Sequence, residues 1–152
     1  EKIISDDGSF LMAKSFPSDN SIEASGVGSF STEYLLDETS LKLFNDSDFE
    51  QIVRDILSQI RAEVLKRNPN FLGHIKLFLE SGSALYKISL TTADEEPTYD
   101  FVPAAGFTSA KTAFSNLKIL SAVTGVESAV LHEIVQKAVE NVLNENGIVR
   151  II

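Results

Sequence analysis

Two runs of alternating apolar and polar residues, at positions 72–80 and 84–90, constrain the fold of this chain more than any other feature. In the first run the apolar side chains recur at every second position, which is typical of a β-strand with one buried face. A polar triplet centred on Gly82 separates the two runs. A short glycine-containing connection between alternating segments predicts a β-hairpin. Its buried face is expected to carry Ile75, Leu77 and Leu79.

Two longer segments show the 3.6-residue period of amphipathic helices. Ser47 and Glu50 form a capping-box pattern at the start of the first helix, and residues 68–69, Asn-Pro, predict its end. Glu50 and Arg54 are one turn apart and are expected to pair. Residues 146–147, Asn-Gly, predict the end of the second helix. The two apolar stripes consist of Phe49, Ile52, Val53, Ile56, Leu57, Ile60, Val64 and Leu65, and of Val130, Leu131, Ile134, Val135, Ala138, Val139, Val142 and Leu143.

Shorter strands are expected on both sides of these segments, with turn-rich connections between them. Two helices are too few to cover both faces of a parallel sheet. Together with the hairpin they therefore predict an α+β fold: a two-layer sandwich of a mainly antiparallel sheet with both helices on one face. The length of 152 residues fits a single domain, in which residues 1–28 are expected to form a loosely packed N-terminal extension. The expected strands span residues 10–16, 29–36, 117–123 and 148–152, and the connections include residues 17–20, 94–97 and 103–106.

The net charge of -9 is unevenly distributed, because residues 1–50 hold eleven acidic residues and only three lysines. Nucleic acids and anionic membrane surfaces are bound by basic proteins, so neither is an expected partner. The acidic third is interpreted as a solubilising surface, with a dedicated basic partner as the alternative. No apolar run approaches the roughly 20 residues needed to cross a bilayer.

The absence of cysteine and of an apolar leader favours a cytoplasmic location. The first residue is glutamate, which predicts a trimmed chain or a fragment of a longer protein.

Sequence motifs for catalysis are absent. The chain has no phosphate-binding P-loop motif and no G-x-S-x-G nucleophile motif, so it is not expected to hydrolyse nucleotides by itself or to use a Ser-His-acid mechanism. The glycines at 26 and 28 precede a predicted strand rather than opening a helix, and they predict a turn rather than a dinucleotide site. We therefore expect no enzyme, no catalytic residue and no cofactor.

Two candidate sites are alternatives to the expectation of a chain without catalytic residues or cofactors. His74 and His132 are metal candidates if the fold brings them together with a carboxylate such as Glu80, since zinc takes three or four clustered ligands. A small enzyme would use His74 with Glu80 or Tyr86. The acidic segment 94–96 is interpreted as a solvated turn and segment 106–111 as a loop, the alternative for the latter being an anion site.

One family resemblance is carried by short motifs. Residues 72–76, Leu-Gly-His-Ile-Lys, lead the hairpin; residues 115–119, Ser-Asn-Leu-Lys-Ile, form a later strand; and residues 125–126, Gly-Val, open the second helix, which runs to Leu143. In this order, over roughly residues 29–145, the chain resembles the C-terminal domain of CobW-type GTPases. In that family a separate GTPase domain with a P-loop and a cysteine-rich metal motif drives metal delivery to cobalamin-related or zinc enzymes. Its C-terminal domain is thought to contact partners.

This chain has neither the P-loop nor any cysteine. The resemblance therefore implies an accessory, non-catalytic role in a metal- or cofactor-handling GTPase system. His74 and Lys76 occupy the motif positions.

The sheet face directed away from the helices is the predicted binding surface. It is expected to bind a protein partner or a second copy of the chain, with His74, Lys76, Phe78 and Lys87 as the binding residues. Phe78 and Leu85 are apolar for a solvated face, so dimerisation that buries them is one expectation. A small-ligand-binding homo-oligomeric module is the alternative to the protein-interaction domain.

Overall fold

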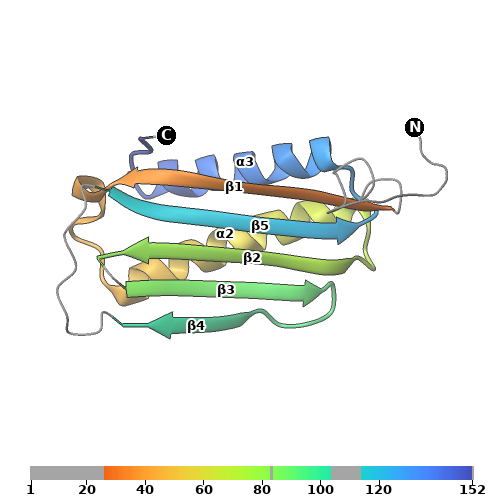
Figure 1. Ribbon diagram of the computed structural model, residues 1–152, viewed down its shortest axis with the longest axis horizontal. Coiled ribbons are helices and arrows are strands. Elements are labelled where there is room, and N and C mark those ends of the chain that lie inside the picture. Colours follow the sequence, from red (N-terminus) through yellow and green to blue (C-terminus); the bar gives the residue numbers. More distant parts are fainter. Residues whose placement is uncertain (1–25, 83, 104–113, 152) are drawn as a thin grey trace, which may run out of the picture.

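The computed structural model describes residues 26–82, 84–103 and 114–151 of the chain (Figure 1). The strand predicted at residues 10–16, the turn at 17–20 and the loop at 106–111 lie outside the described residues. Val27 and Gly28, which the predicted N-terminal extension includes, belong to the first described strand. The elements in chain order are β1 Val27–Asp37, a short 3-10 helix η1 Glu38–Leu41, α2 Asp46–Arg67, β2 Leu72–Ser81, β3 Ala84–Thr92, β4 Thr98–Val102, β5 Phe114–Thr124 and α3 Ser128–Glu145.

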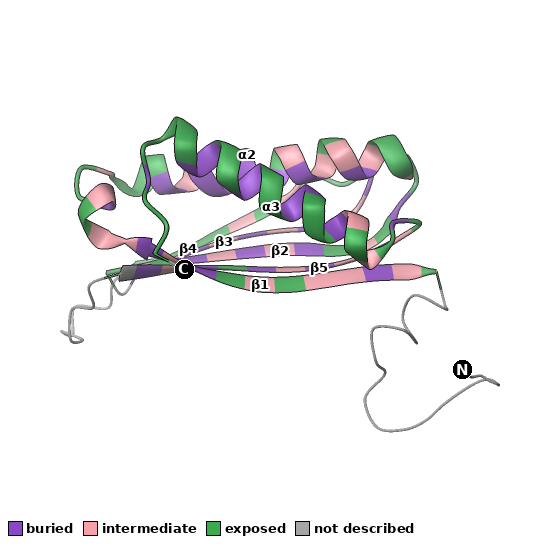
Figure 2. Ribbon diagram, turned by 90° about the horizontal axis from the view of Figure 1, so that it is seen from above, coloured by how far each residue is buried: buried purple, intermediate pink, exposed green. Residues whose placement is uncertain are grey.

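The five strands form one sheet in the order β1-β5-β2-β3-β4, and every neighbouring pair is antiparallel. The last strand in the sequence, β5, lies between β1 and β2. Figure 2 shows both helices on the same side of this sheet. The predicted two-layer α+β sandwich with an antiparallel sheet and two helices on one face is confirmed.

The core lies between the sheet and the helix layer. The inward-facing residues of the hairpin predicted to be buried, Ile75, Leu77 and Leu79, are at most 1% exposed. The apolar stripes of both helices face them, apart from Leu65 and Val130, which are only partly buried. Alternation along the strands and the helical period along α2 and α3 therefore direct the apolar side chains into one shared core.

The predicted hairpin is present, and it contains an irregularity close to its start. β2 and β3 pair from Ser81 opposite Ala84 to Leu72 opposite Thr92, with a shift of register between Leu72 and Ile75. Gly73 lies in this shift with φ +136°, and a Cβ atom there would come within 1.9 Å of the Ala122 carbonyl oxygen. Only glycine avoids both the strained φ and the contact with β5. The backbone conformation of β2 and its contact with β5 thus explain why the 72–76 motif contains a glycine.

The capping residues of α2 differ from the prediction. The Asn45 side chain accepts a hydrogen bond from the Asp48 amide at 2.9 Å, and the Asp48 carboxylate accepts one from the Asn45 amide at 3.0 Å. The capping box based on Ser47 was wrong because the N-cap lies two residues earlier, at Asn45, and the helix begins at Asp46. Glu50 instead pairs with Arg54 at 2.7 Å, as predicted.

Two strand predictions require correction. β4 was missed, because it is short, lies at the edge of the sheet and is largely exposed, so it lacks a strong apolar pattern. The C-terminal strand at 148–152 is reduced in the described residues to a single bridge between Leu36 and Arg150. Backbone hydrogen bonds from Asp37 to Val149 and from Ile151 to Leu35 attach this segment to the edge of β1.

Candidate functional site

The side of the sheet away from the helices is covered by no other described element (Figures 1 and 2). We call this surface the open face. It consists of the outward-facing side chains, which alternate along each strand with the buried ones. Its central residues are Glu33 and Leu35 on β1, Asn116, Lys118 and Leu120 on β5, His74, Lys76, Phe78 and Glu80 on β2, Leu85, Lys87 and Ser89 on β3, and Asp100 and Val102 on β4.

One row of residues crosses all five strands of the open face. The register places Glu33, Lys118, Phe78, Lys87 and Asp100 side by side in that order. Neighbouring strands are about 4.8 Å apart, so the backbones carrying the two lysines are separated by roughly 10 Å. An aromatic ring therefore lies between two cations, with an acidic residue at each end of the row.

The lysines of the open face surround Phe78. The Lys87 ammonium lies 5.9 Å from the centre of the Phe78 ring, which is within the range of a cation–π contact. Lys76 is two positions along β2 and projects from the same face, opposite Leu120 on β5. Among the described residues, no ion pair joins Lys76, Lys87 or Lys118 to a carboxylate. The centre of the open face is consequently a basic, partly apolar patch in an acidic chain.

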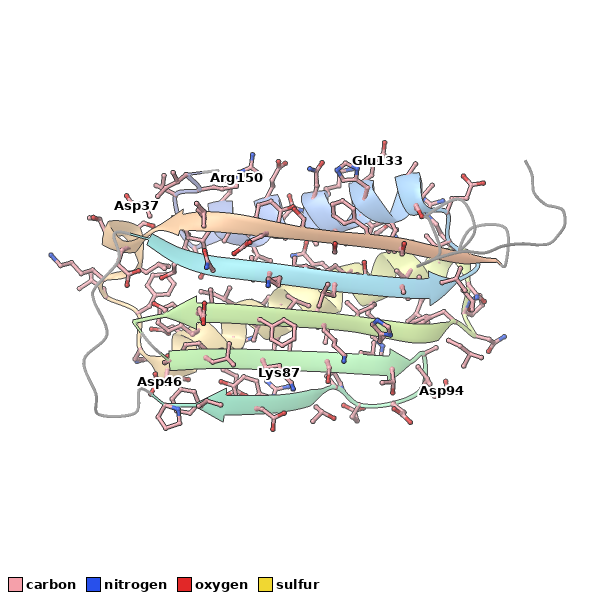
Figure 3. All side chains as sticks on the ribbon, viewed as in Figure 1. Asp37, Asp46, Lys87, Asp94, Glu133 and Arg150 are labelled. Atoms are coloured by element: carbon pink, nitrogen blue, oxygen red, sulfur yellow. The ribbon has the colours of Figure 1, made fainter. Side chains whose placement is uncertain are left out.

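The open face carries all the residues predicted for binding. Lys76, Phe78 and Lys87 are immediate neighbours, and Figure 3 labels Lys87 on β3 in the view onto this face. His74 is exposed and lies four residues from Phe78, opposite Ala122, so it belongs to the periphery of the patch. Whether these residues bind a partner stays a prediction.

Sequence reasoning missed the contribution of β5 to this patch. Lys118 and Leu120 alternate with the buried residues Leu117 and Ile119, and this alternation predicted the strand. The alternation does not tell which strand lies beside β5. Only the pairing of β5 with β2 brings Lys118 next to Phe78.

The metal site considered as an alternative required the two histidines to lie together, and the described structure does not bring them together. His132 projects from α3 and stacks on Phe30 with ring centres 4.3 Å apart, on the helix side of the sheet. His74 projects from the open face on the other side. Glu80 is six residues from His74 along β2, which corresponds to about 20 Å. In the described segments, no group of three or more His, Asp or Glu residues could hold a metal ion.

The combination of His74 with Tyr86 is also not formed. Tyr86 points into the core, where it is 2% exposed, and its hydroxyl donates a hydrogen bond to the Asp46 carboxylate at 2.5 Å. Burial raises the pKa of Tyr86, and the neighbouring Asp46 carboxylate raises it further. This tyrosine joins β3 to the first turn of α2 and is separated from His74 by the sheet.

Two hollows lie outside the open face. One of about 460 Å³ lies at the start of α3, between residues 26–28 and residues 125–129. A Cβ atom at Gly28 would lie 1.7 Å from the Val126 carbonyl oxygen, so glycine at this position allows the strand and the loop to pack closely. The other, of about 610 Å³, is a groove between α2 and α3 with charges of both signs, including Glu63, Arg67 and Lys137.

Comparisons with known proteins returned no relatives. No family model matches the chain, no curated protein matches it, and no solved structure matches it. Within the described part of the chain, neither helix has the length and apolar character required to cross a bilayer. The fold and the open face together define the class of the protein: a two-layer α+β domain in which no described element covers one face of the sheet.

Proposed function

We propose that this chain is a non-catalytic accessory domain that binds a protein partner through the open face of its sheet. The observation that carries the proposal is the patch centred on Phe78, where half-buried apolar side chains lie beside lysines that form no ion pair with another described residue. Protein interfaces typically combine a partly apolar centre, enriched in aromatic residues, with a polar rim. The patch has this composition.

Nucleic acid is a weaker candidate for the same surface. Binding of a phosphate backbone requires an extended basic surface that displaces counterions. The central row of the open face ends in Glu33 on one edge strand and Asp100 on the other. The whole chain also carries a net charge of -9.

The resemblance of residues 72–76 to CobW-type C-terminal domains indicates which partner to test first. The motif residues His74 and Lys76 both belong to the open face, while Gly73 is required by the irregular start of β2. We accordingly propose that the partner belongs to a metal- or cofactor-handling GTPase system. This association depends on the motif alone, whereas the open-face interaction depends on the geometry.

Direct binding measurements test both parts. The purified chain is titrated by biolayer interferometry against a purified CobW-type GTPase. Phe78→Ser removes the central anchor, and Leu43→Ser makes the same kind of change at a side chain that is 94% exposed outside the open face. We expect Phe78→Ser to weaken binding by at least about tenfold, as for a central interface residue, and Leu43→Ser to leave affinity within about twofold.

Circular dichroism and thermal unfolding confirm that both variants are folded before they are compared. An unchanged affinity of folded Phe78→Ser contradicts the role of the open face. Complete absence of binding by the unmodified chain contradicts the association with the GTPase system.

A further inference from the structure

We infer that the open face selects an acidic segment of a protein partner, in which carboxylates on both sides of an apolar residue engage Lys87 and Lys118 while the apolar residue packs on Phe78. This inference depends on the proposed function and specifies the chemistry of its partner. It derives from the sign and the spacing of the charges around Phe78.

The charge at the centre of the open face is opposite to that of the whole chain. Lys76, Lys87 and Lys118 lie around one aromatic ring, and no carboxylate among the described residues neutralises them by an ion pair. The three like charges repel one another in the free protein, and Glu33 and Asp100, the cross-strand neighbours of Lys118 and Lys87, offset this repulsion only in part because they form no ion pair with the lysines. An acidic partner relieves this repulsion on binding.

The spacing in the central row restricts where the acidic groups of a partner can lie. Lys118 and Lys87 belong to strands on either side of β2, about 10 Å apart by two interstrand spacings. Glu33 and Asp100 follow directly outside them. Carboxylates placed over the lysines are attracted, and those placed one strand further out are repelled, so the row favours one alignment of the partner.

A second copy stacked face to face on the central row does not supply carboxylates over Lys87 and Lys118. In a face-to-face dimer centred on Phe78, a two-fold axis along the strands places Lys87 of each copy over Lys118 of the other. A two-fold axis along the row places each lysine over its own equivalent. Both arrangements oppose like charges, which costs free energy at a desolvated interface.

Fluorescence anisotropy with the full chain and labelled synthetic peptides tests the inference. The probe is a serine-rich peptide whose only charged side chains are two glutamates on each side of one central phenylalanine. Three matched peptides replace the glutamates by glutamine, the glutamates by lysine, or the phenylalanine by serine. Duplex DNA and vesicles of phosphatidylserine and phosphatidylcholine serve as the other anionic probes.

Protein variants identify the surface that the peptide uses. The double substitution Lys87→Gln and Lys118→Gln removes both charges that flank Phe78. The matched control is the double substitution Lys66→Gln and Lys137→Gln. It removes two exposed lysines from the helix layer and changes the net charge of the chain by the same amount as the open-face variant.

We expect the glutamate peptide to bind the unmodified chain more tightly than each matched peptide does. The double open-face variant is expected to weaken the affinity for the glutamate peptide by at least about tenfold, and the control variant by less than about twofold. Raising the salt concentration from about 50 to about 300 mM is expected to weaken binding to the unmodified chain. Since the peptide series and the salt dependence use the unmodified chain, the test does not depend on the folding of a variant.

Three results overturn the inference: equal affinity for the glutamine peptide, an equal effect of the control variant, or tighter binding of DNA or vesicles that the open-face variant abolishes. No binding of the glutamate peptide up to about 1 mM, the weak end of specific affinities, also overturns it. If Phe78→Ser still weakens the GTPase complex in that case, the proposed function stands and only the acidic chemistry of the partner is rejected.

Discussion

Tyr86 illustrates how a single polar atom is accommodated in the core of this domain. Its ring packs against Phe49 and Phe101, with ring centres 4.9 and 5.1 Å away. Its hydroxyl reaches the edge of the core, where it donates to Asp46 at the exposed start of α2. The hydrogen bond satisfies the hydroxyl, and the aspartate is favourably placed at the positive end of the helix dipole.

Replacement Tyr86→Phe is expected to lower the free energy of unfolding by about 1–2 kcal/mol at neutral pH, because a hydrogen bond to a charged acceptor is lost. The cost should shrink at alkaline pH. Tyrosine in the unfolded chain deprotonates near its ordinary pKa of about 10, whereas burial and Asp46 keep the folded hydroxyl protonated. Above about pH 10 the unmodified chain therefore loses stability that the variant cannot lose.

Urea unfolding of both proteins between about pH 7 and pH 11 measures this difference. Tyr34 and Tyr99 also have raised pKa values, mainly through burial, so both proteins retain a slope from these residues. A difference in stability between the two proteins that is constant with pH would contradict the assignment to Tyr86.

At the scale of elements, helix boundaries and edge strands were harder to predict than the elements themselves. The apolar period located α2, but Ser47 and Asn45 are both suitable capping residues two positions apart. The choice depends on where the backbone leaves the extended conformation, which the structure places at Asn45. β4 escaped prediction for a similar reason, because an exposed edge strand need not show a buried face.

Two alanine substitutions compare the predicted and the observed cap. Asn45→Ala is expected to lower the free energy of unfolding by about 1 kcal/mol, since the side-chain acceptor for the Asp48 amide is lost. Ser47→Ala is expected to change it by only a few tenths of a kcal/mol, because Ser47 is exposed within the first turn and alanine is a good helix former. Chemical denaturation of the two variants measures both values; a larger cost at Ser47 would contradict the observed capping box.

At the scale of the whole molecule, the two layers leave one face of the sheet that no other described element covers. α2 and α3 occupy one side of the sheet, and the alternation of the strands places a mixed set of lysines and apolar residues on the other (Figure 3). An uncovered sheet face with apolar residues is typical of an interaction surface. The charges around Phe78 favour an unlike partner over a second copy.

Sedimentation equilibrium tests this preference. The protein is expected to remain a monomer at about 50 μM and low salt, because face-to-face association opposes the lysines of the two copies. A dimer at this concentration that dissociates on Phe78→Ser substitution would instead support the homo-oligomeric alternative. The Leu43→Ser variant is the control for a general loss of surface hydrophobicity.

Most of the local structure follows from the sequence by itself. The period of two at residues 72–90 determined the hairpin, and the period of 3.6 determined both helices and their buried stripes. These patterns succeed because neighbouring residues report directly which face of an element is buried. They also identified Lys76, Phe78 and Lys87 as residues of one face, since all three belong to the hairpin.

The order of the strands was decided only by the tertiary structure. The pairing of β5 between β1 and β2 joins residues that are distant in the sequence, and it brings Lys118 and Leu120 to Phe78. The packing of α3 on the helix side of the sheet likewise separates His132 from His74, which projects from the open face. Local periodicity is shared by every half-buried strand, whereas the choice of a neighbour depends on how all elements together bury one core.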